Sequence, residues 1–222
     1  MAILAHPDDG ESLCGGTLAK LAAEGCTIRY LIATRGDKGS DDPEMTSERL
    51  MPIREQEQQE AAKVLGVQEI VFLNGYYDGL VEPTLELRQA LTLALRQWKP
   101  DVVFTFDPWK HYEIHPDHRA IGTCAFDAIA AARGRLSYPE QLQYGITAHK
   151  VRQVYFFATD QPNHWVDIAE TIEQKIEARC KHASQMNPTN HPSIYLHRWA
   201  SEAGAASGKG YALAEAFHYY GL

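Results

Sequence analysis

Short apolar segments rich in β-branched and aromatic residues alternate along this chain with longer segments of helical periodicity. The strand-like segments are residues 1–5, 26–33, 69–73, 101–106 and 151–158. The helix-like segments are residues 17–24, 48–65, 85–98, 116–132, 168–182 and 193–203. We expect Gly15-Gly16 to open the first of these helices. A short final segment covers residues 212–219. Strands that alternate with helices in this way predict a mostly parallel, right-handed α/β sheet.

Polar, turn-prone residues follow four of the predicted strands at the point where each strand ends. These exits are His6-Pro7-Asp8-Asp9, Thr34-Arg35-Gly36-Asp37, Asn74-Gly75 and Asp107-Pro108-Trp109. Ligands of open α/β sheets bind beyond the carboxyl ends of the strands. The chain order therefore gathers several titratable side chains at one edge of the sheet: His6, Asp8, Asp9, Asp37 and Asp107.

The bulk composition narrows the class of protein. Of the 222 residues, 45% are hydrophobic and 23% are charged, so the chain can bury a substantial core. The formal net charge of -8 argues against a nucleic-acid backbone as partner, because phosphate contacts need clustered Lys and Arg. No apolar run approaches the roughly 20 residues of a membrane span, and we expect neither a span nor a secretory leader. The sequence thus predicts a cytoplasmic protein.

The first exit, His6-Pro7-Asp8-Asp9, contains the residue types of a metal site. A catalytic zinc ion takes three protein ligands and leaves one position for water. A His and an Asp three residues apart in a tight turn can reach one ion, while the neighbouring Asp points elsewhere and stays free. The alternative is a structural role, in which an Asp caps the helix that follows.

The second segment of interest, His115-Pro116-Asp117-His118, supplies a His pair with a carboxylate between them. By itself this segment is also typical of a surface helix that starts with a capping Asp. Two such motifs at one edge of the predicted sheet together indicate a metal site.

Both motifs resemble those of the LmbE-like or PIG-L-like family of metal-dependent N-deacetylases. That family has an A-H-P-D-D-E type motif after its first strand and an H-x-D-H motif after a later strand. Here they read Ala5-His6-Pro7-Asp8-Asp9-Gly10-Glu11 and His115-Pro116-Asp117-His118. Shorter similarities extend along nearly the whole chain: Gly15-Gly16-Thr17, Thr34-Arg35-Gly36-Asp37, Arg54 with Glu57, Phe106-Asp107-Pro108 and Glu215-Ala216-Phe217. The resemblance implies a three-layer Rossmann-like α/β fold, a mostly parallel sheet flanked by helices with extra C-terminal segments, in a single deacetylase domain over residues 1–222.

The resemblance also implies a ligand set for the metal. His6, Asp9 and His118 would hold the ion, which we expect to be zinc. Because His and Asp ligands suit several divalent ions, Fe2+ and others are alternatives. Two departures from the family pattern bear on the first motif. Gly10 separates Asp9 from Glu11, where many members place Glu directly after the two Asp residues, and only five residues precede His6, so we expect a clipped first strand or an unusual start.

Three further residues would carry the catalysis in this resemblance. Asp8 would be the general base that takes a proton as water attacks an amide carbonyl. His115 would stabilise the oxyanion or act as an acid, and Asp117 would orient His115. The sequence leaves open whether Asp8 or His115 returns a proton to the leaving amine.

Contacts with the substrate are harder to assign. Arg54 suits a sugar hydroxyl or a negative group, although a surface salt bridge would explain it equally well. Asp37 could accept hydrogen bonds from hydroxyls. Trp109 could stack on a sugar face or could pack its own loop.

These residues predict an enzyme that removes an N-acetyl or other N-acyl group from a small amino sugar such as an N-acetylglucosamine derivative. An amidase that acts on a thiol-sugar conjugate, or on an antibiotic-like glycan, would share the same metal site. A metal-bound sugar-binding protein without catalysis and a purely structural metal site are the non-enzymatic alternatives. The sequence also allows a homo-oligomer.

Overall fold

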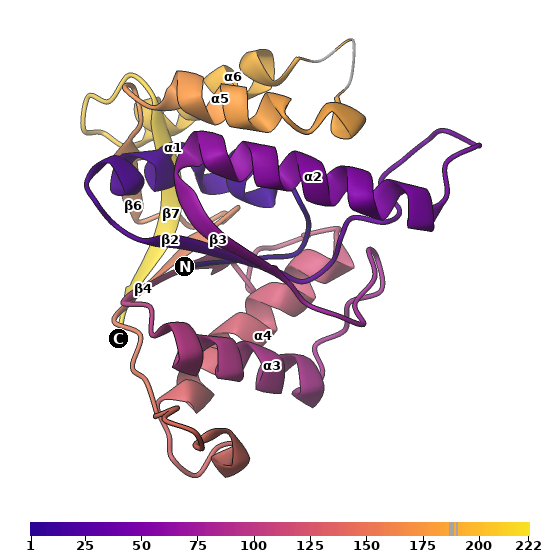
Figure 1. The fold of residues 1–222 in the computed structure, drawn as a ribbon. Helices are drawn as coiled ribbons and strands as arrows, with labels where there is room; N and C mark the ends of the chain where they lie inside the picture. Colours follow the sequence, from indigo (N-terminus) through magenta and orange to yellow (C-terminus); the bar gives the residue numbers. More distant parts are fainter. Residues whose placement is uncertain (187–188, 190) are drawn as a thin grey trace.

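A computed structural model describes residues 1–186, 189 and 191–222 of the chain. In this described part, seven strands form one sheet with the order β3-β2-β1-β4-β5-β7-β6 (Figure 1). Five of them run parallel: β1 (Ala2–Leu4), β2 (Ile28–Ile32), β3 (Val67–Phe72), β4 (Val102–Phe106) and β5 (Gln153–Phe157). At the far edge, β7 (Ala214–Gly221) runs antiparallel to both β5 and β6 (His164–Asp167). The predicted mostly parallel sheet is confirmed.

The helices cover both faces of the sheet (Figure 1). Helices α1 (Asp9–Ala23) and α2 (Ser47–Leu65) lie on one face, and α3 (Leu85–Trp98) and α4 (Pro116–Ala132) lie on the other. The C-terminal helix α5 (Ile172–Cys180) packs on α1 and α2, and α6 (Pro192–Ala206) packs on α5 and β7. Two short 3-10 turns, Pro139–Gln141 and Ala183–Gln185, complete the described elements. The molecule is the predicted three-layer α/β fold with additional C-terminal elements.

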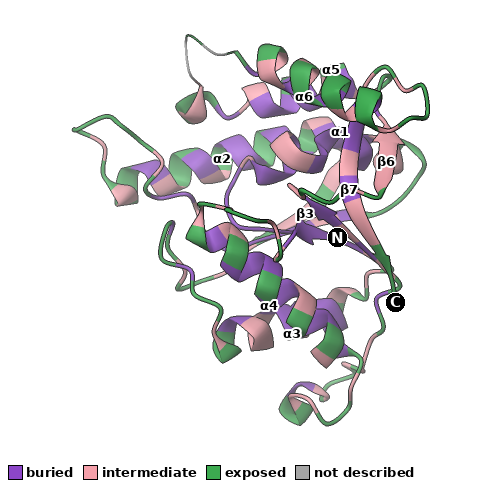
Figure 2. Ribbon diagram, turned by 180° about the vertical axis from the view of Figure 1, so that it is seen from behind, coloured by how far each residue is buried: buried purple, intermediate pink, exposed green. Residues whose placement is uncertain are grey.

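Helix α1 differs from the prediction at its start. The helix begins at Asp9, so Gly15 and Gly16 lie inside it and do not open it. A Cβ on Gly16 would lie 2.9 Å from the side chain of Ile168, and one on Gly15 would lie 3.3 Å from Cγ of Lys175. The two glycines therefore allow the C-terminal segments to approach α1 closely. Figure 2 shows the result as a run of buried residues along α1, between the sheet and α5.

Strand β6 was not predicted. It has four residues, all half-buried, at the edge of the sheet, so it lacks the buried apolar run that reveals the other strands. The predicted final segment over 212–219 is strand β7, and the helix predicted over 168–182 is the shorter α5. None of the described helices is long and apolar enough to cross a membrane.

The strand order places the two sequence motifs side by side. Strands β1 and β4 are neighbours, and the first motif follows β1 while the second lies at the start of α4, beyond β4. The chain leaves β1 toward α1 on one face and leaves β4 toward α4 on the opposite face. This is the switch point of the sheet, where ligands bind in open α/β folds.

Candidate metal centre and active site

The turn after β1 folds the carboxylate of Asp9 back toward the end of the strand. Asp9 Oδ2 accepts hydrogen bonds from the backbone N–H of Ala5 at 3.0 Å and of His6 at 2.7 Å. Asp8, between His6 and Asp9, has a φ of 89°, a left-handed conformation that Asp tolerates better than most residues. The positive φ lets the two neighbouring carboxylates leave the chain in different directions, as the sequence predicted.

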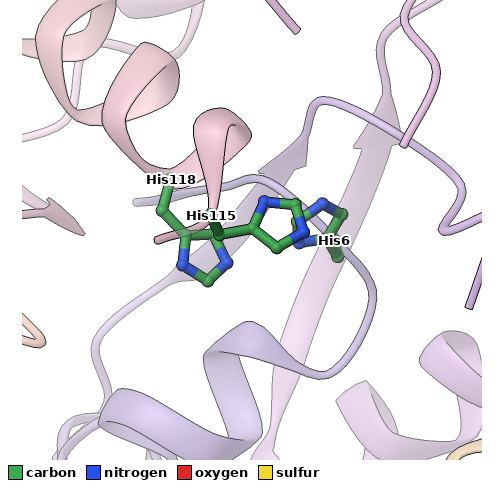
Figure 3. A group of neighbouring side chains, drawn as sticks. All are labelled: His6, His115 and His118. Atoms are coloured by element: carbon green, nitrogen blue, oxygen red, sulfur yellow. The ribbon is translucent and has the colours of Figure 1, made fainter. Parts of the chain in front are cut away.

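The start of α4 brings two more imidazoles to His6. His115 is the N-cap residue of α4, and Pro116 occupies the first turn. The ring centroid of His115 lies 4.5 Å from that of His6 and 4.6 Å from that of His118. The ring of His118 stacks on Phe106, the last residue of β4, at 4.1 Å. Figure 3 shows the three rings grouped between the end of β1 and the first turn of α4.

The donor atoms of this group fit a divalent metal ion. Each of the three imidazoles offers one nitrogen, and these atoms lie within 4.8 Å of one another. Asp9 reaches the same place, because its Oδ2 lies 3.6 Å from His6 Nδ1 and its Oδ1 lies 3.6 Å from His118 Nε2. Two donors that bind one zinc ion tetrahedrally at the usual bond lengths lie about 3.4 Å apart. The structure therefore brings together the ligand set implied by the resemblance, with His115 beside it.

A carboxylate lies on the far side of each of the two candidate ligand imidazoles. Asp117 Oδ2 lies 2.9 Å from His6 Nε2, and Glu113 Oε1 lies 3.5 Å from His118 Nδ1. A ring nitrogen that gives its proton to a carboxylate leaves the opposite nitrogen free to bind metal. The structure thus pairs Asp117 with His6, whereas the resemblance implied a pair with His115.

The loop between β3 and α3 adds a carboxylate that the motifs did not reveal. Asp78 Oδ1 lies 3.2 Å from His6 Nε2 and 3.7 Å from His115 Nε2. Asp117 fixes this loop by accepting hydrogen bonds from the N–H groups of Gly79 and Val81, and Asp37 fixes it by accepting one from the N–H of Asp78. A second metal-compatible group therefore exists, made of His6, Asp78, His115 and Asp117.

The surrounding charges favour a cation at this place. Burial alone would lower the pKa of His6, but Asp117, Asp78 and Asp9 together raise it well above its usual value. Burial would raise the pKa of Asp9, but His118 and His6 outweigh it and hold that pKa below its usual range. Carboxylates that favour a proton on His6 also favour a metal ion in place of that proton.

The pKa values of the other two catalytic candidates, Asp8 and His115, shift in opposite directions. Burial raises the pKa of Asp8, and the charges of Arg54 and Arg179 oppose this rise. Burial lowers the pKa of His115, and the neighbouring His6 and His118 lower it further. Both groups thus lie in an environment that penalises their charged forms.

Two arginine side chains hold the carboxylate of Asp8 away from the candidate metal ligands. Its Oδ2 lies 3.5 Å from Arg54 Nη2 and 3.3 Å from Arg179 Nη2. Its backbone N–H donates to Gln58 Oε1 at 3.0 Å. Gln58 also donates to Glu11 Oε1. Glu11, the residue after Gly10, therefore supports the turn through Gln58.

The three residues expected to contact substrate lie in different environments. Arg54 is buried and donates to the carbonyls of Gly36 and Pro7, and Asp37 is buried and holds the loop of Asp78. Trp109 is 61% exposed, with its ring edge-on to Phe126 and Phe156. Of these three side chains, that of Trp109 is exposed to solvent and the other two are buried.

Sequence reasoning missed three residues of the site: Asp78, Glu113 and Arg179. Asp78 follows the third strand, so its position at a strand exit was the signal that could have found it. Glu113 lies two residues before His115, within the loop that leads to the second motif. Arg179 lies on α5, where nothing in the local sequence points to the site.

Comparison with known proteins gives this geometry a family. Residues 1–129 match the family model PIG-L, described as GlcNAc-PI de-N-acetylase. The chain belongs to this family. A diacetylchitobiose deacetylase from Thermococcus kodakarensis is 34% identical over 215 residues, which cover 96% of this chain and 80% of the relative. A mycothiol S-conjugate amidase from Streptomyces coelicolor is 30% identical over 176 residues, or 70% of this chain and 59% of the relative.

A solved structure supports the same assignment over the whole fold. The N,N'-diacetylchitobiose deacetylase from Pyrococcus horikoshii, in complex with an inhibitor, matches with a TM-score of 0.94 and 33% sequence identity. The match covers 99% of this chain and 82% of that chain. The predicted PIG-L fold and the predicted enzyme class are both confirmed: the chain is a hydrolase of the deacetylase and amidase type.

Proposed function

We propose that this chain, as one domain over residues 1–222, is a zinc-dependent hydrolase that removes the N-acetyl group from an amino sugar such as an N-acetylglucosamine derivative. One observation carries the proposal. His6, Asp9 and His118 converge on a point that suits a metal ion, and the carboxylate of Asp8 leaves the same turn without joining them. A base beside an open metal site is the arrangement that amide hydrolysis needs.

His6, Asp9 and His118 would hold the ion, and zinc bound there supplies a Lewis acid and lowers the pKa of water. Asp8 accepts a proton from the water that attacks the amide carbonyl. His115 donates a hydrogen bond to the carbonyl oxygen as it gains negative charge. The C–N bond then breaks, the proton returns to the nitrogen, and the products are acetate and the free amine of the sugar.

The substrate enters from the exposed side of the site in this proposal. The ring of His115 is half-exposed on that side, and the loop after β4 presents the exposed ring of Trp109. An indole held edge-on by two aromatic neighbours can stack on the apolar face of a sugar. Arg54 and Asp37, which are buried, contribute chiefly by fixing Pro7 and Asp78.

The decisive experiment measures amine release. The protein is reconstituted with zinc and incubated with N-acetylglucosamine, its glycosides and diacetylchitobiose, and the free primary amine and acetate are quantified. We expect equal amounts of both products from at least one of these compounds. Asp8→Asn should lower kcat by about 10²–10⁴-fold with the metal still bound, because the base is lost while the ligands stay.

The matched control is Asp127→Asn, which changes a carboxylate whose side chain is 49% exposed on α4. This variant should keep wild-type turnover, and chelation of the metal should abolish turnover in both proteins. If Asp8→Asn retained wild-type kcat, Asp8 would not be the base. If one metal ion bound per chain and no acyl amine were hydrolysed, the proposed reaction would be wrong.

The similarity to an S-conjugate amidase favours one alternative substrate. The same residues could hydrolyse an amide that links an amino sugar to a thiol-bearing acyl group. Running a thiol-sugar conjugate beside the acetylated sugars separates the two, because the preferred substrate has the larger kcat/KM. Metal analysis of the active protein distinguishes zinc from Fe2+, which the same donors accept.

A further inference from the structure

Arg179 reaches the candidate base from a part of the chain that the family model does not match. The matched residues end at 129, whereas Arg179 lies near the end of α5. Its side chain is 11% exposed, with Nη2 3.3 Å from Asp8 Oδ2 and Nε donating to Ser12 Oγ at 3.2 Å. The guanidinium therefore bridges the base and the first turn of α1.

Asp8 is a residue whose side chain needs external support. Its positive φ places it in a conformation that costs free energy for a residue with a Cβ. Arg54 approaches the same oxygen, Oδ2, from α2 at 3.5 Å, and it is itself fixed by the carbonyls of Gly36 and Pro7. Two guanidinium groups from different helices thus act on one carboxylate oxygen, so the other oxygen can face the reacting water.

Helix α5 is fixed in the place that this contact requires. Lys175, one turn before Arg179, forms a buried ion pair with Glu215 at 2.6 Å. After the helix, the N–H and hydroxyl of Ser184 both donate to the carboxylate of Glu57 on α2. The segment that carries Arg179 is therefore held on both sides of this residue, which fixes its backbone near Asp8.

We propose that Arg179 is a positioning residue for the reaction: it holds Oδ2 of Asp8 so that Oδ1 accepts the proton from the attacking water. The inference rests on the proposed function, in which Asp8 is the base. A base held in a fixed orientation speeds a reaction because it is already placed for attack. A loss of that orientation lowers kcat, while substrate binding through the rest of the site continues.

The test compares Arg179→Gln and Arg179→Lys in the zinc-loaded full chain. We expect Arg179→Gln to lower kcat by about 10²-fold and to change KM by less than about threefold. Arg179→Lys, which keeps the charge but not the planar fork, should fall between this variant and the wild type. The control is Arg198→Gln on α6, whose side chain is 64% exposed and which should keep wild-type kcat. Zinc content and thermal midpoint are measured for every variant. A purely structural role would lower these two quantities and would not lower kcat selectively while KM stays nearly constant.

Wild-type kcat in both Arg179 variants would overturn the proposal. An equal loss of kcat in both variants, together with a lower zinc content and a lower thermal midpoint, would also overturn it. Crystal structures of the zinc-loaded wild type and of Arg179→Gln give a readout that does not depend on turnover. A displaced Asp8 carboxylate in the variant supports the positioning role, and an unchanged one contradicts it. A wild-type protein that hydrolysed no amide would refute the proposed function, and these structures would still decide the role of Arg179.

Discussion

The carboxylate of Asp117 contacts both His6 and the backbone of the loop between β3 and α3. It is fully buried, it accepts hydrogen bonds from the N–H groups of Gly79 and Val81, and its Oδ2 lies 2.9 Å from His6 Nε2. A carboxylate in this position fixes the tautomer of a metal-binding imidazole. The structure therefore supports a role for Asp117 in metal binding, through His6.

Asp117→Asn tests this role, because the amide keeps the shape of the side chain and removes its charge. We expect the dissociation constant for zinc to rise about 10–100-fold, as for other changes behind a metal-binding histidine. A competition titration with a chromophoric chelator measures it. Asp127→Asn, on the exposed side of the same helix, should leave the affinity unchanged. Unchanged zinc affinity with a reduced kcat would instead favour the pairing with His115 that the family resemblance implied.

Gly10 shows how a departure from the family motif is accommodated. A Cβ at Gly10 would lie 2.6 Å from Oη of Tyr30 and 2.8 Å from its Cζ. Tyr30 belongs to β2 and is fully buried, so it fills the space that a side chain at position 10 would need. The glycine and the tyrosine are therefore a matched pair of small and large residues.

We predict that Gly10→Ala destabilises the protein by about 1–3 kcal/mol through overpacking, although Ala is the better helix former. Urea denaturation measures the free energy of unfolding. The loss should shrink by at least about 1 kcal/mol when Tyr30→Leu removes the obstructing ring. Gly134→Ala is the control, since a Cβ there would meet no atom closer than 3.5 Å. A cost that stayed the same in the Tyr30→Leu background would refute the pairing.

Residues that form part of a motif were predictable, and residues that meet them through folding were not. His6, Asp9 and His118 could be placed at one edge because the alternation of strands and helices predicts parallel strands, whose carboxyl ends share one edge of the sheet. Asp78 and Arg179 arrive from a loop and a helix that carry no signature, and their distances to His6 and Asp8 depend on packing. The partner of Asp117 was also beyond prediction, because it depends on where the loop of Gly79 lies.

At the level of elements, local signals fixed some boundaries and packing fixed others. Helix α3 has the predicted bounds because Thr84 caps it through a hydrogen bond to the N–H of Leu87, and α4 has them because Pro116 lies in its first turn. The predicted start of α1 was wrong because Gly15 and Gly16 allow close contacts with Lys175 of α5 and with Ile168, which no local pattern reveals. Single-sequence reasoning detects capping residues better than it detects close approach between distant helices.

The first half of the segment over 134–149 is held by a buried cation. Arg96 of α3 is fully buried and donates to the carbonyls of Ala131, Gly134 and Ser137, and to Gln141 Oε1. Burial lowers the pKa of Arg96. One arginine thus fastens the end of α4 and the first half of the segment to α3.

The ion pair of Lys175 and Glu215 joins three elements. It connects α5 with β7, and Glu215 also accepts hydrogen bonds from the N–H groups of Gly16 and Thr17 in α1. Both side chains are at most 5% exposed. Removing one partner of a buried pair leaves an uncompensated charge, which is more costly than the loss of the attraction itself.

Lys175→Met should therefore lower the free energy of unfolding by about 3–5 kcal/mol, measured by chemical denaturation. Adding Glu215→Gln should recover part of this loss, because the amide carries no charge and its one oxygen still accepts from one of the two N–H groups. Lys181→Met, at a half-exposed pair with Glu177, should change stability by less than about 0.5 kcal/mol. Equal effects of Lys175→Met and Lys181→Met would show that the buried pair does not hold the C-terminal elements.

At the scale of the whole molecule, a metal ion held by the proposed ligands would join segments that are far apart in the chain. His6 and Asp9 follow the first strand, whereas His118 lies on α4. Along the chain, His118 is more than 100 residues away from both His6 and Asp9. An ion that binds them together therefore stabilises the folded state over the unfolded chain, by an amount that grows with its free concentration.

We predict that zinc at about 100 times its dissociation constant stabilises the protein by about 2.7 kcal/mol. For a chain of this size the shift in thermal midpoint is about 5–10 °C. Calorimetry of metal-free and zinc-loaded protein measures the shift, and His118→Ala should abolish most of it because a ligand is lost. His197→Ala on α6, a half-exposed histidine, should keep the full shift. A full shift that survived in His118→Ala would place the ion on the other group of His6, Asp78, His115 and Asp117, and the proposed base would then lie beside the wrong ligands.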